Sequence, residues 1–342
     1  MSITLQDIAN YAGVSNATVS RVVNNPISVT IKTREKVLRV IEKFNYVPNA
    51  IARSLSRNET NTIGIIVPDI TNPFFGKIIR GISTILREKD YNIVMCDTDE
   101  NIINEDNSIQ MLKELHVRGL IITPTIEQEK TNNLKLMNIE QSGIPVVLVD
   151  RDTNSSNLDG VFLDNIKAGL DVTQSFINAG HKKIATILGP TDSKASIERA
   201  LGYRQALEMN GINIDPSYIL NGWSYSMECG YEMTKKLFEL DEPPTAIFIG
   251  SSILSQACIN ALLDSNIKIP QDMAIIGFGE IPYMKTFGTN ISYIERYVRE
   301  MGEYAANLLI DRIENPKQGQ SVCKRIIIPP KLVLNGSELY CN

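Results

Sequence analysis

The chain has 342 residues, of which 43% are hydrophobic and 21% charged, and its formal net charge is −5. These values are typical of folded globular proteins and exclude the disordered, collagenous and membrane-spanning classes. At about 100–200 residues per domain, the length predicts two or three domains. No apolar run reaches the roughly 20 residues that cross a bilayer, and the N-terminus lacks the basic start and apolar core of a signal peptide. We therefore expect a cytoplasmic protein.

The histidines and cysteines predict neither a metal site nor a disulfide framework. His116 and His181 have no cysteine, histidine or carboxylate at a spacing that suits metal binding or nucleophilic catalysis. The cysteines are odd in number and far apart, which fits a reducing compartment. They are Cys96, Cys229, Cys258, Cys323 and Cys341. We expect no metal, no cofactor and no enzymatic activity.

Charge is divided unevenly along the chain. Residues 1–60 hold eight basic and four acidic residues, a balance of +4, so the remainder carries −9. A basic N-terminal segment on an acidic body predicts that this segment alone meets a polyanion.

Residues 4–24 predict two short helices with a tight turn between them. Thr4 and Ser15 suit the N-caps of the two helices, and Gly13 suits the turn. This arrangement is a helix-turn-helix, whose second helix exposes its first residues to base edges. A third helix over 32–44 would place Thr33 in its first turn, where a phosphate can bind.

Residues 48–56 have the sequence PNAIARSLS, which is too short for a stable isolated helix. From the residues alone, two roles stay open for Leu55. It could pack on the third helix, or it could wedge between base steps of DNA.

From residue 62 onward, short Ile- and Val-rich runs alternate with helical stretches, which predicts parallel sheets covered on both faces. The predicted strands are 63–67, 93–96, 119–122, 146–149, 184–188, 246–249 and 273–276. Since the pattern starts afresh near residue 161, we expect two doubly wound subdomains. A ligand would bind between them, beyond the carboxyl ends of the strands.

Specific motifs resemble the lactose-repressor and galactose-repressor (LacI/GalR) family of bacterial transcriptional regulators. In the basic segment these are TLQDIANYAGVSNATVSRVVN, V-x-x-x-TREKV and FNYVPNAIARSL. In the body they are VPDITNPFFGKIIRGI, GIPVVLVDR, NAGHKKIATILGP and NIKIPQDMAIIGFGEIP. The resemblance implies an all-α helix-turn-helix head with a hinge helix, followed by an α/β body of two doubly wound parallel-sheet subdomains similar to periplasmic sugar-binding proteins.

The resemblance implies a set of DNA contacts. Asn16, Ala17 and Arg21 would lie at the major groove, and Leu55 would be the minor-groove wedge. The fork of Arg21 matches guanine, whereas Asn16 could pair with adenine or touch only a phosphate. The full set is Thr4, Ser15, Asn16, Ala17, Thr18, Ser20, Arg21, Asn24, Thr33, Asn49, Ala52 and Leu55.

The resemblance also implies a binding site for a small effector, a sugar or sugar derivative, in the body cleft. The candidates are Asn72, Phe74, Asp150, Arg151, Arg199, Trp223, Ser251 and Glu280. Taken singly, Trp223 could equally be a half-buried packing residue. Ser251-Ser252 and Gly279-Glu280 stand where many relatives have amide and acidic pairs, which leaves a different sugar, an acidic ligand or another metabolite open.

We therefore predict a cytoplasmic, homodimeric repressor that binds operator DNA under control of the effector. Two alternatives are a periplasmic-type solute-binding protein, which the missing signal peptide and residues 1–60 disfavour, and an α/β enzyme. The expected domains are residues 1–48 for the head and 49–61 for the hinge and linker. Residues 62–161 with 291–320 form the N-terminal subdomain, and 162–290 with 321–342 the C-terminal one. The chain would thus cross between subdomains near residues 161, 290 and 321.

Overall fold

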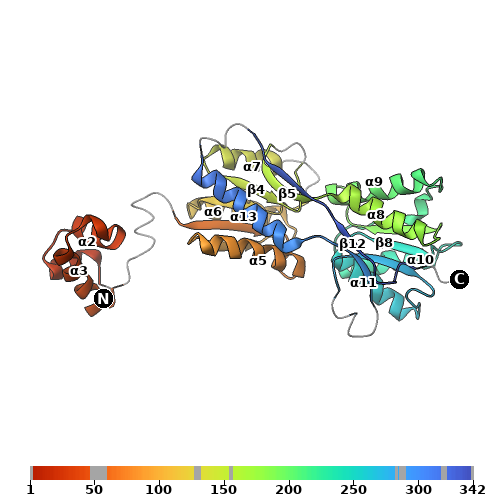
Figure 1. The fold of residues 1–342 in the computed structure, drawn as a ribbon, viewed down its shortest axis with the longest axis horizontal. Coiled ribbons are helices and arrows are strands. Elements are labelled where there is room, and N and C mark those ends of the chain that lie inside the picture. The colour runs from red at the N-terminus through yellow and green to blue at the C-terminus, as the bar shows by residue number, and fades with distance from the viewer. Residues whose placement is uncertain are drawn as a thin grey trace. The chain divides into compact units, whose positions relative to one another are not determined.

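The computed structural model describes residues 3–46, 60–126, 132–153, 157–281, 284, 290–316 and 322–339 (Figure 1). The chain divides into two compact units, Met1–Thr60 and Asn61–Asn342. We call the first the head and the second the body. Within the described residues, no helix combines the length and apolar character that a membrane span requires.

The head contains the predicted helix-turn-helix and a third helix. Its helices are α1 (Leu5–Ala12), α2 (Asn16–Asn24) and α3 (Ile31–Lys43), with a short 3₁₀ helix at Pro26–Ser28. The predicted caps are confirmed, because the side chains of Thr4 and Ser15 accept hydrogen bonds from backbone N–H groups of α1 and α2. Gly13 ends α1 at φ 59°, a left-handed conformation that glycine adopts readily.

The first subdomain of the body is a parallel sheet in the order β11-β5-β4-β3-β1-β2. Its strands are β1 (Thr62–Val67), β2 (Asn92–Asp97), β3 (Gly119–Ile122), β4 (Val146–Val149), β5 (Asp159–Leu163) and β11 (Arg325–Ile328). Core contacts place α5 (Pro73–Glu88) and α13 (Val298–Glu314) on one face, and α6 (Ile102–Glu114) and α7 (Asn132–Gln141) on the other.

The second subdomain is a sheet in the order β12-β10-β9-β8-β6-β7, in which only the pairing of β10 with β12 is antiparallel. Its strands are β6 (Ile184–Leu188), β7 (Ile219–Asn221), β8 (Ala246–Ile249), β9 (Ala274–Phe278), β10 (Ser292–Glu295) and β12 (Lys331–Val333). One face carries α8 (Asn165–Asn178) and α9 (Lys194–Met209), and the other α10 (Met227–Phe238) and α11 (Ser252–Asp264). The prediction of two α/β subdomains, each a sheet covered by helices on both faces, is therefore confirmed.

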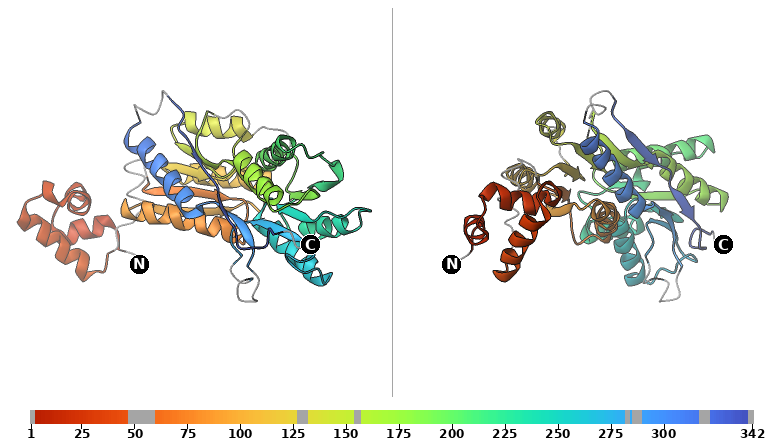
Figure 2. Two further views of the ribbon diagram at one scale, coloured as in Figure 1. Left: turned by 45° about the vertical axis from the view of Figure 1, so that its right-hand side comes forward. Right: turned by 60° about the vertical axis from the view of Figure 1, so that its left-hand side comes forward.

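The predicted subdomain boundaries are wrong in detail. β5 runs to Leu163 within the first sheet, so the first crossing lies at Asp164 rather than 161. β10 pairs with β9 in the second sheet, so residues 292–295 do not belong to the first subdomain. β11 pairs with β5, so the last crossing follows residue 328 rather than 321 (Figure 2). An apolar strand pattern shows that a segment is paired, but it does not show with which sheet.

Each subdomain contains a pair of helices whose backbones touch at glycines. In α5 and α13, which lie side by side in Figures 1 and 2, an added Cβ at Gly81 would overlap the carbonyl of Arg299. In α8 and α9, a Cβ at Gly169 would overlap the carbonyl of Arg199. The reciprocal contacts are made by Gly302 and Gly202. Both helix pairs therefore require glycine at the crossing point.

This geometry yields a matched pair of stability predictions within α5. Gly81→Ala should lower the free energy of unfolding of the body by about 2–3 kcal/mol, because the helices must separate. Gly76→Ala should be neutral or stabilising by up to about 1 kcal/mol, since a Cβ there meets nothing within 4 Å and alanine favours the helix. Urea unfolding of both variants measures the difference. Equal effects of the two substitutions would contradict the close helix contact.

Candidate functional site

In the head, the residues predicted to read bases lie together on the exposed side of α2. Asn16, Ala17 and Arg21 are exposed, whereas Val19 and Val22 of the same helix are buried in the core of the head. The side chain of Asn16 donates a hydrogen bond to Gln6 on α1. The start of α2 thus presents an accessible face that is suited to a DNA groove.

The phosphate candidates lie beside this face. The hydroxyls of Ser15 and Thr18 form a hydrogen bond at 3.0 Å. Thr18 and Ser20 are partly buried. At the start of α3, the Thr30 hydroxyl donates a hydrogen bond to the Thr33 hydroxyl at 3.0 Å and does not cap the helix. The first backbone N–H groups of α3 are therefore free of a side-chain cap and can bind an anion. The side chain of Asn24 and the hinge candidates Asn49, Ala52 and Leu55 lie outside the described residues.

In the body, a cavity of about 250 Å³ opens between the carboxyl ends of the two sheets. Six of the eight predicted effector residues line it: Asn72, Phe74, Asp150, Arg151, Arg199 and Ser251. They follow β1, β4, β6 and β8, so loops distant in sequence meet at one place.

Trp223 and Glu280 do not line this cavity. Trp223 is 56% exposed, and Tyr225 lies at the cavity instead. The hydroxyl of Tyr225 lies 2.8 Å from the hydroxyls of both Ser193 and Ser196, which hold the ring in place. Ser226 caps α10 directly after Tyr225, so the start of this helix follows the ring.

Arg199 reaches the cavity from α9 and is only 5% exposed. Its Nε donates to Asn165 at 3.0 Å, its Nη1 donates to the carbonyl of Gly250, and its guanidinium lies 4.0 Å from the ring centre of Phe278. Burial lowers the pKa of Arg199 below its ordinary value. The neighbouring contacts hold this guanidinium in one orientation at the cavity wall.

Arg151 is held by a carboxylate. It makes two hydrogen bonds to Glu100, at 2.6 and 2.8 Å, and a third to the carbonyl of Pro124 at 3.2 Å. Burial lowers the pKa of Arg151, but the bonds to Glu100 outweigh burial and raise the pKa above its ordinary value. Arg151 is therefore a charged, paired group at the cavity wall.

A third arginine of the cavity, Arg296, was not predicted. It lies between β10 and α13, where the chain crosses from the second subdomain to the first, and it is only 7% exposed. Its guanidinium lies 4.0 Å from the ring centre of Phe74 in one subdomain and 5.2 Å from that of Phe278 in the other. No motif in the sequence marks a residue at such a crossing.

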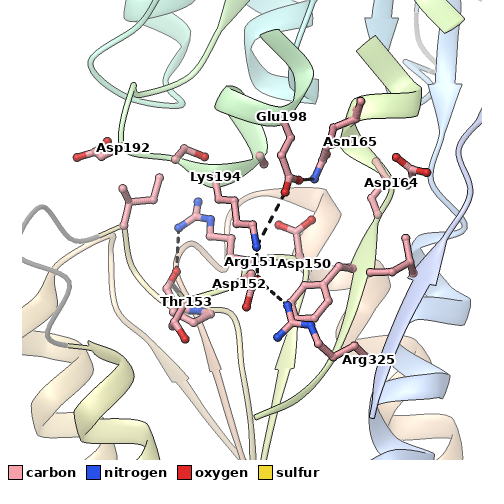
Figure 3. A pocket seen from close by; sticks show the side chains of 18 of the residues that line it. Asp150, Arg151, Asp152, Thr153, Asp164, Asn165, Asp192, Lys194, Glu198 and Arg325 are labelled. Carbon is pink, nitrogen blue, oxygen red and sulfur yellow. Dashed lines mark hydrogen bonds and ion pairs between the residues drawn. The ribbon is translucent and has the colours of Figure 1, made fainter. Parts of the chain in front are cut away.

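A second cavity, of about 190 Å³, adjoins the first and shares Asp150 and Arg151 with it (Figure 3). Figure 3 shows Lys194 and Glu198 approaching from one side and Asp152 and Arg325 from the other. Asp152 pairs with both Lys194 of the second subdomain and Arg325 of the first, the latter at 2.5 Å. The cavity wall is thus an ion-pair network that joins the subdomains.

The described residues that line the two cavities include no histidine or cysteine. His181 is buried elsewhere, 2.8 Å from the Thr245 hydroxyl and 3.2 Å from the carbonyl of Glu338. The part of the chain that the structure describes also contains no cluster of three His, Cys, Asp or Glu side chains placed to hold a metal ion. The cavities are therefore built for binding by arginine, carboxylate, hydroxyl and aromatic groups.

The comparisons with known families match both units. Residues 4–49 match the family described as bacterial regulatory proteins, lacI family. Residues 60–335 match the periplasmic binding proteins and sugar binding domain of the LacI family.

Similar proteins extend over nearly the whole chain. Catabolite control protein A of Priestia megaterium is 35% identical over 314 residues, covering 90% of this chain and 92% of the relative. The transcriptional regulator DegA of Bacillus subtilis (strain 168) is 32% identical over 342 residues, covering 100% of both. The regulator CelR in complex with cellobiose has a TM-score of 0.72 at 27% identity, covering 98% and 99%. The lac repressor dimer bound to operator has a TM-score of 0.84 at 23% identity, covering 99% and 100%, which supports the fold.

The ion-pair network yields a prediction for Asp152, whose side chain is 9% exposed. Asp152→Asn should lower the free energy of unfolding of the body by about 1–2 kcal/mol, less than for a fully buried pair because Lys194 and Arg325 are partly solvated. As a control, Asp171→Asn removes the pair between Lys167 and Asp171 within α8 and should change stability by less than about 0.5 kcal/mol. Urea unfolding tests both. No loss in Asp152→Asn would show that the network does not join the subdomains energetically.

Proposed function

The chain belongs to the lacI family of bacterial regulatory proteins, and from this premise we propose the function of this DNA-binding transcriptional regulator. It is a repressor whose affinity for operator DNA is set by a small molecule bound in the body cavity. The observation that carries the proposal is the exposed face of Asn16, Ala17 and Arg21 on a helix-turn-helix, in one chain with a cavity lined by two subdomains.

Two copies of the chain are proposed to bind one operator. Each chain carries one helix-turn-helix, which contacts only a half-site, and a two-fold dimer matches a near-palindromic operator. The similar lac repressor is a dimer bound to operator. Asn49, Ala52 and Leu55 remain predicted contacts of a hinge helix, in which Leu55 would enter the minor groove.

The ligand is proposed to act by changing the relative geometry of the two subdomains. A molecule that binds one geometry of the cavity better than another shifts the populations of both, and the linked heads follow. Among similar proteins, CelR is known in complex with cellobiose, which supports a sugar or sugar derivative as the general class. We propose no cofactor and no catalytic activity, since the described lining of the cavity contains no histidine or cysteine to act as a base or a thiol nucleophile. We propose a cytoplasmic location because the family acts on DNA.

The test is footprinting of the full chain on genomic DNA, followed by binding titrations on the protected sites. We expect paired, near-palindromic half-sites. Arg21→Ala should weaken specific binding by about 1–3 kcal/mol and relax specificity at one base pair of each half-site. Arg39→Ala, which removes an exposed arginine of α3, is the matched control. Protection of a single half-site, or equal effects of the two variants, would overturn the proposal.

Leu55 provides a separate test of the hinge contact. Leu55→Ala should weaken binding to the operator at least about tenfold and leave binding to random DNA at the same salt concentration largely unchanged, because a wedge acts only at a bendable step. Equal losses on both DNAs would place Leu55 away from the minor groove.

A further inference from the structure

We propose that the ligand of the body cavity carries a negatively charged group, a carboxylate or a phosphate, and that Arg296 and Arg199 together hold it. The inference rests on the proposed function, because it specifies the chemical class that the same cavity takes. It begins from two buried guanidinium groups that form no ion pair with the described residues.

Arg296 has few partners for a buried cation. Its Nη2 donates to the hydroxyl of Ser252 at 2.8 Å, whereas its Nε has no hydrogen-bond partner among the described residues although it is buried. A guanidinium has five N–H donors, and a buried donor without an acceptor is costly. Arg296 lines the cavity, where an anion could accept hydrogen bonds from its guanidinium.

Arg199 and Arg296 approach the same aromatic ring. Their guanidinium carbons lie 4.0 and 5.2 Å from the ring centre of Phe278. No ion pair to either arginine is found among the described residues. The contacts of Arg199 to Asn165 and Gly250 are with neutral groups, so they satisfy donors without balancing charge.

Burial and neighbouring positive charges lower the pKa of both arginines. Burial lowers the pKa of Arg296 to about 10, Asp150 opposes the shift, and the charge of Arg199 adds to it. Burial likewise lowers the pKa of Arg199. Both groups stay charged at neutral pH, and an anion between them would relieve the penalty that burial imposes.

The described acids near the cavity form no ion pair with these two arginines. Glu100 is engaged by Arg151, and Asp69 accepts hydrogen bonds from the backbone and hydroxyl of Thr71. Asp99 is exposed to water, which screens it. Asp150 acts on both arginines, Glu198 acts on Arg199, and Glu295 acts on Arg296. Glu198 lies 3.9 Å from Lys194, and Glu295 accepts hydrogen bonds from the backbone N–H groups of Arg296 and Tyr297, so neither acid forms an ion pair with the two guanidinium groups.

The remaining lining suits a hydroxylated molecule attached to the anionic group. Ser251 and Tyr225 offer polar groups to the cavity, and Phe74 offers an apolar one. Guanidinium groups recognise carboxylates and phosphates alike through charge-assisted hydrogen bonds. A sugar acid and a sugar phosphate are therefore the two sources of the same chemistry.

A different role for Arg296 is purely mechanical, since it stacks on Phe74 and Phe278 and so links the subdomains. Ser252 separates the two roles. Ser252→Asp would place a carboxylate against Arg296 at the first turn of α11, where an acid is favourable, and would supply the counter-charge from the protein itself. In Ser252→Asn the new side chain has the same size as aspartate but carries no charge.

The experiment uses the full chain and measures its Tm against graded concentrations of defined probes at constant ionic strength. The probes are inorganic phosphate and three matched sets, each a neutral sugar with its charged derivatives: glucose with glucuronate and glucose 6-phosphate, galactose with galacturonate, and ribose with ribose 5-phosphate. A ligand that binds the folded state raises Tm, and the rise grows with the logarithm of the ligand concentration above Kd. Acids and phosphates are separate arms, so the result also distinguishes the two sources.

We expect at least one anionic probe to raise Tm where its neutral parent does not. Its affinity should fall at least about tenfold in both Arg296→Gln and Ser252→Asp, because each removes the uncompensated charge. Ser252→Asn adds a side chain of the same size as aspartate without the charge, so it should lose clearly less affinity than Ser252→Asp. Arg299→Gln, which removes an exposed arginine of α13 that pairs with Glu303, should stay within about threefold of wild type.

Three outcomes would overturn the assignment: no anionic probe raises Tm, a neutral parent raises it equally, or Ser252→Asp and Ser252→Asn lose affinity alike. Operator binding, measured beside Tm, keeps this result separate from the proposed function. A neutral sugar that changes operator affinity would leave the repressor function standing and remove the charge assignment. An anion that binds with the expected pattern among the variants, but does not change operator affinity, would support the charge assignment and contradict the proposed control of operator binding.

Discussion

Close contact between helix backbones fixes where the arginines of the cavity lie. Gly169 lets α8 approach the backbone of Arg199 itself, and the same helix supplies Asn165 to its guanidinium. In the other subdomain, Gly81 holds α5 against α13 one turn beyond Arg296, and α5 supplies Phe74. Because backbone contacts leave little freedom for adjustment, Arg199 is presented by a rigid pair of helices, and Arg296 lies directly before α13, which belongs to the other rigid pair. The site is therefore an outcome of helix packing as much as of strand order.

Parallel strands explain why so much of the cavity was visible in the sequence. Asn72, Asp150 and Ser251 each follow a short apolar strand, and loops that follow parallel strands gather at one edge of a sheet. The caps Thr4 and Ser15 were visible for a similar reason, since each is satisfied by hydrogen bonds within three residues along the chain.

The features that sequence reasoning missed depend on contacts between distant segments. Trp223 and Tyr225 are both aromatic and two residues apart, and only the path of the chain from β7 to α10 decides which ring meets the cavity. Arg296 gains its importance from Phe74 and Phe278, which lie on different subdomains. The pairing of β10 and β11 is likewise set by partners far away, such as β5 for β11, and short strands carry no local mark of their partner.

The last crossing of the chain has a consequence for how the body is made. β11 and β12, separated by two residues, form an outer strand of the first and of the second sheet respectively. Each sheet therefore gains its outer strand only when residues 325–333 have been synthesised, although the partner strands β5 and β10 are made earlier. Neither subdomain is complete until residues 325–333 have been synthesised, so the two finish folding together rather than in succession.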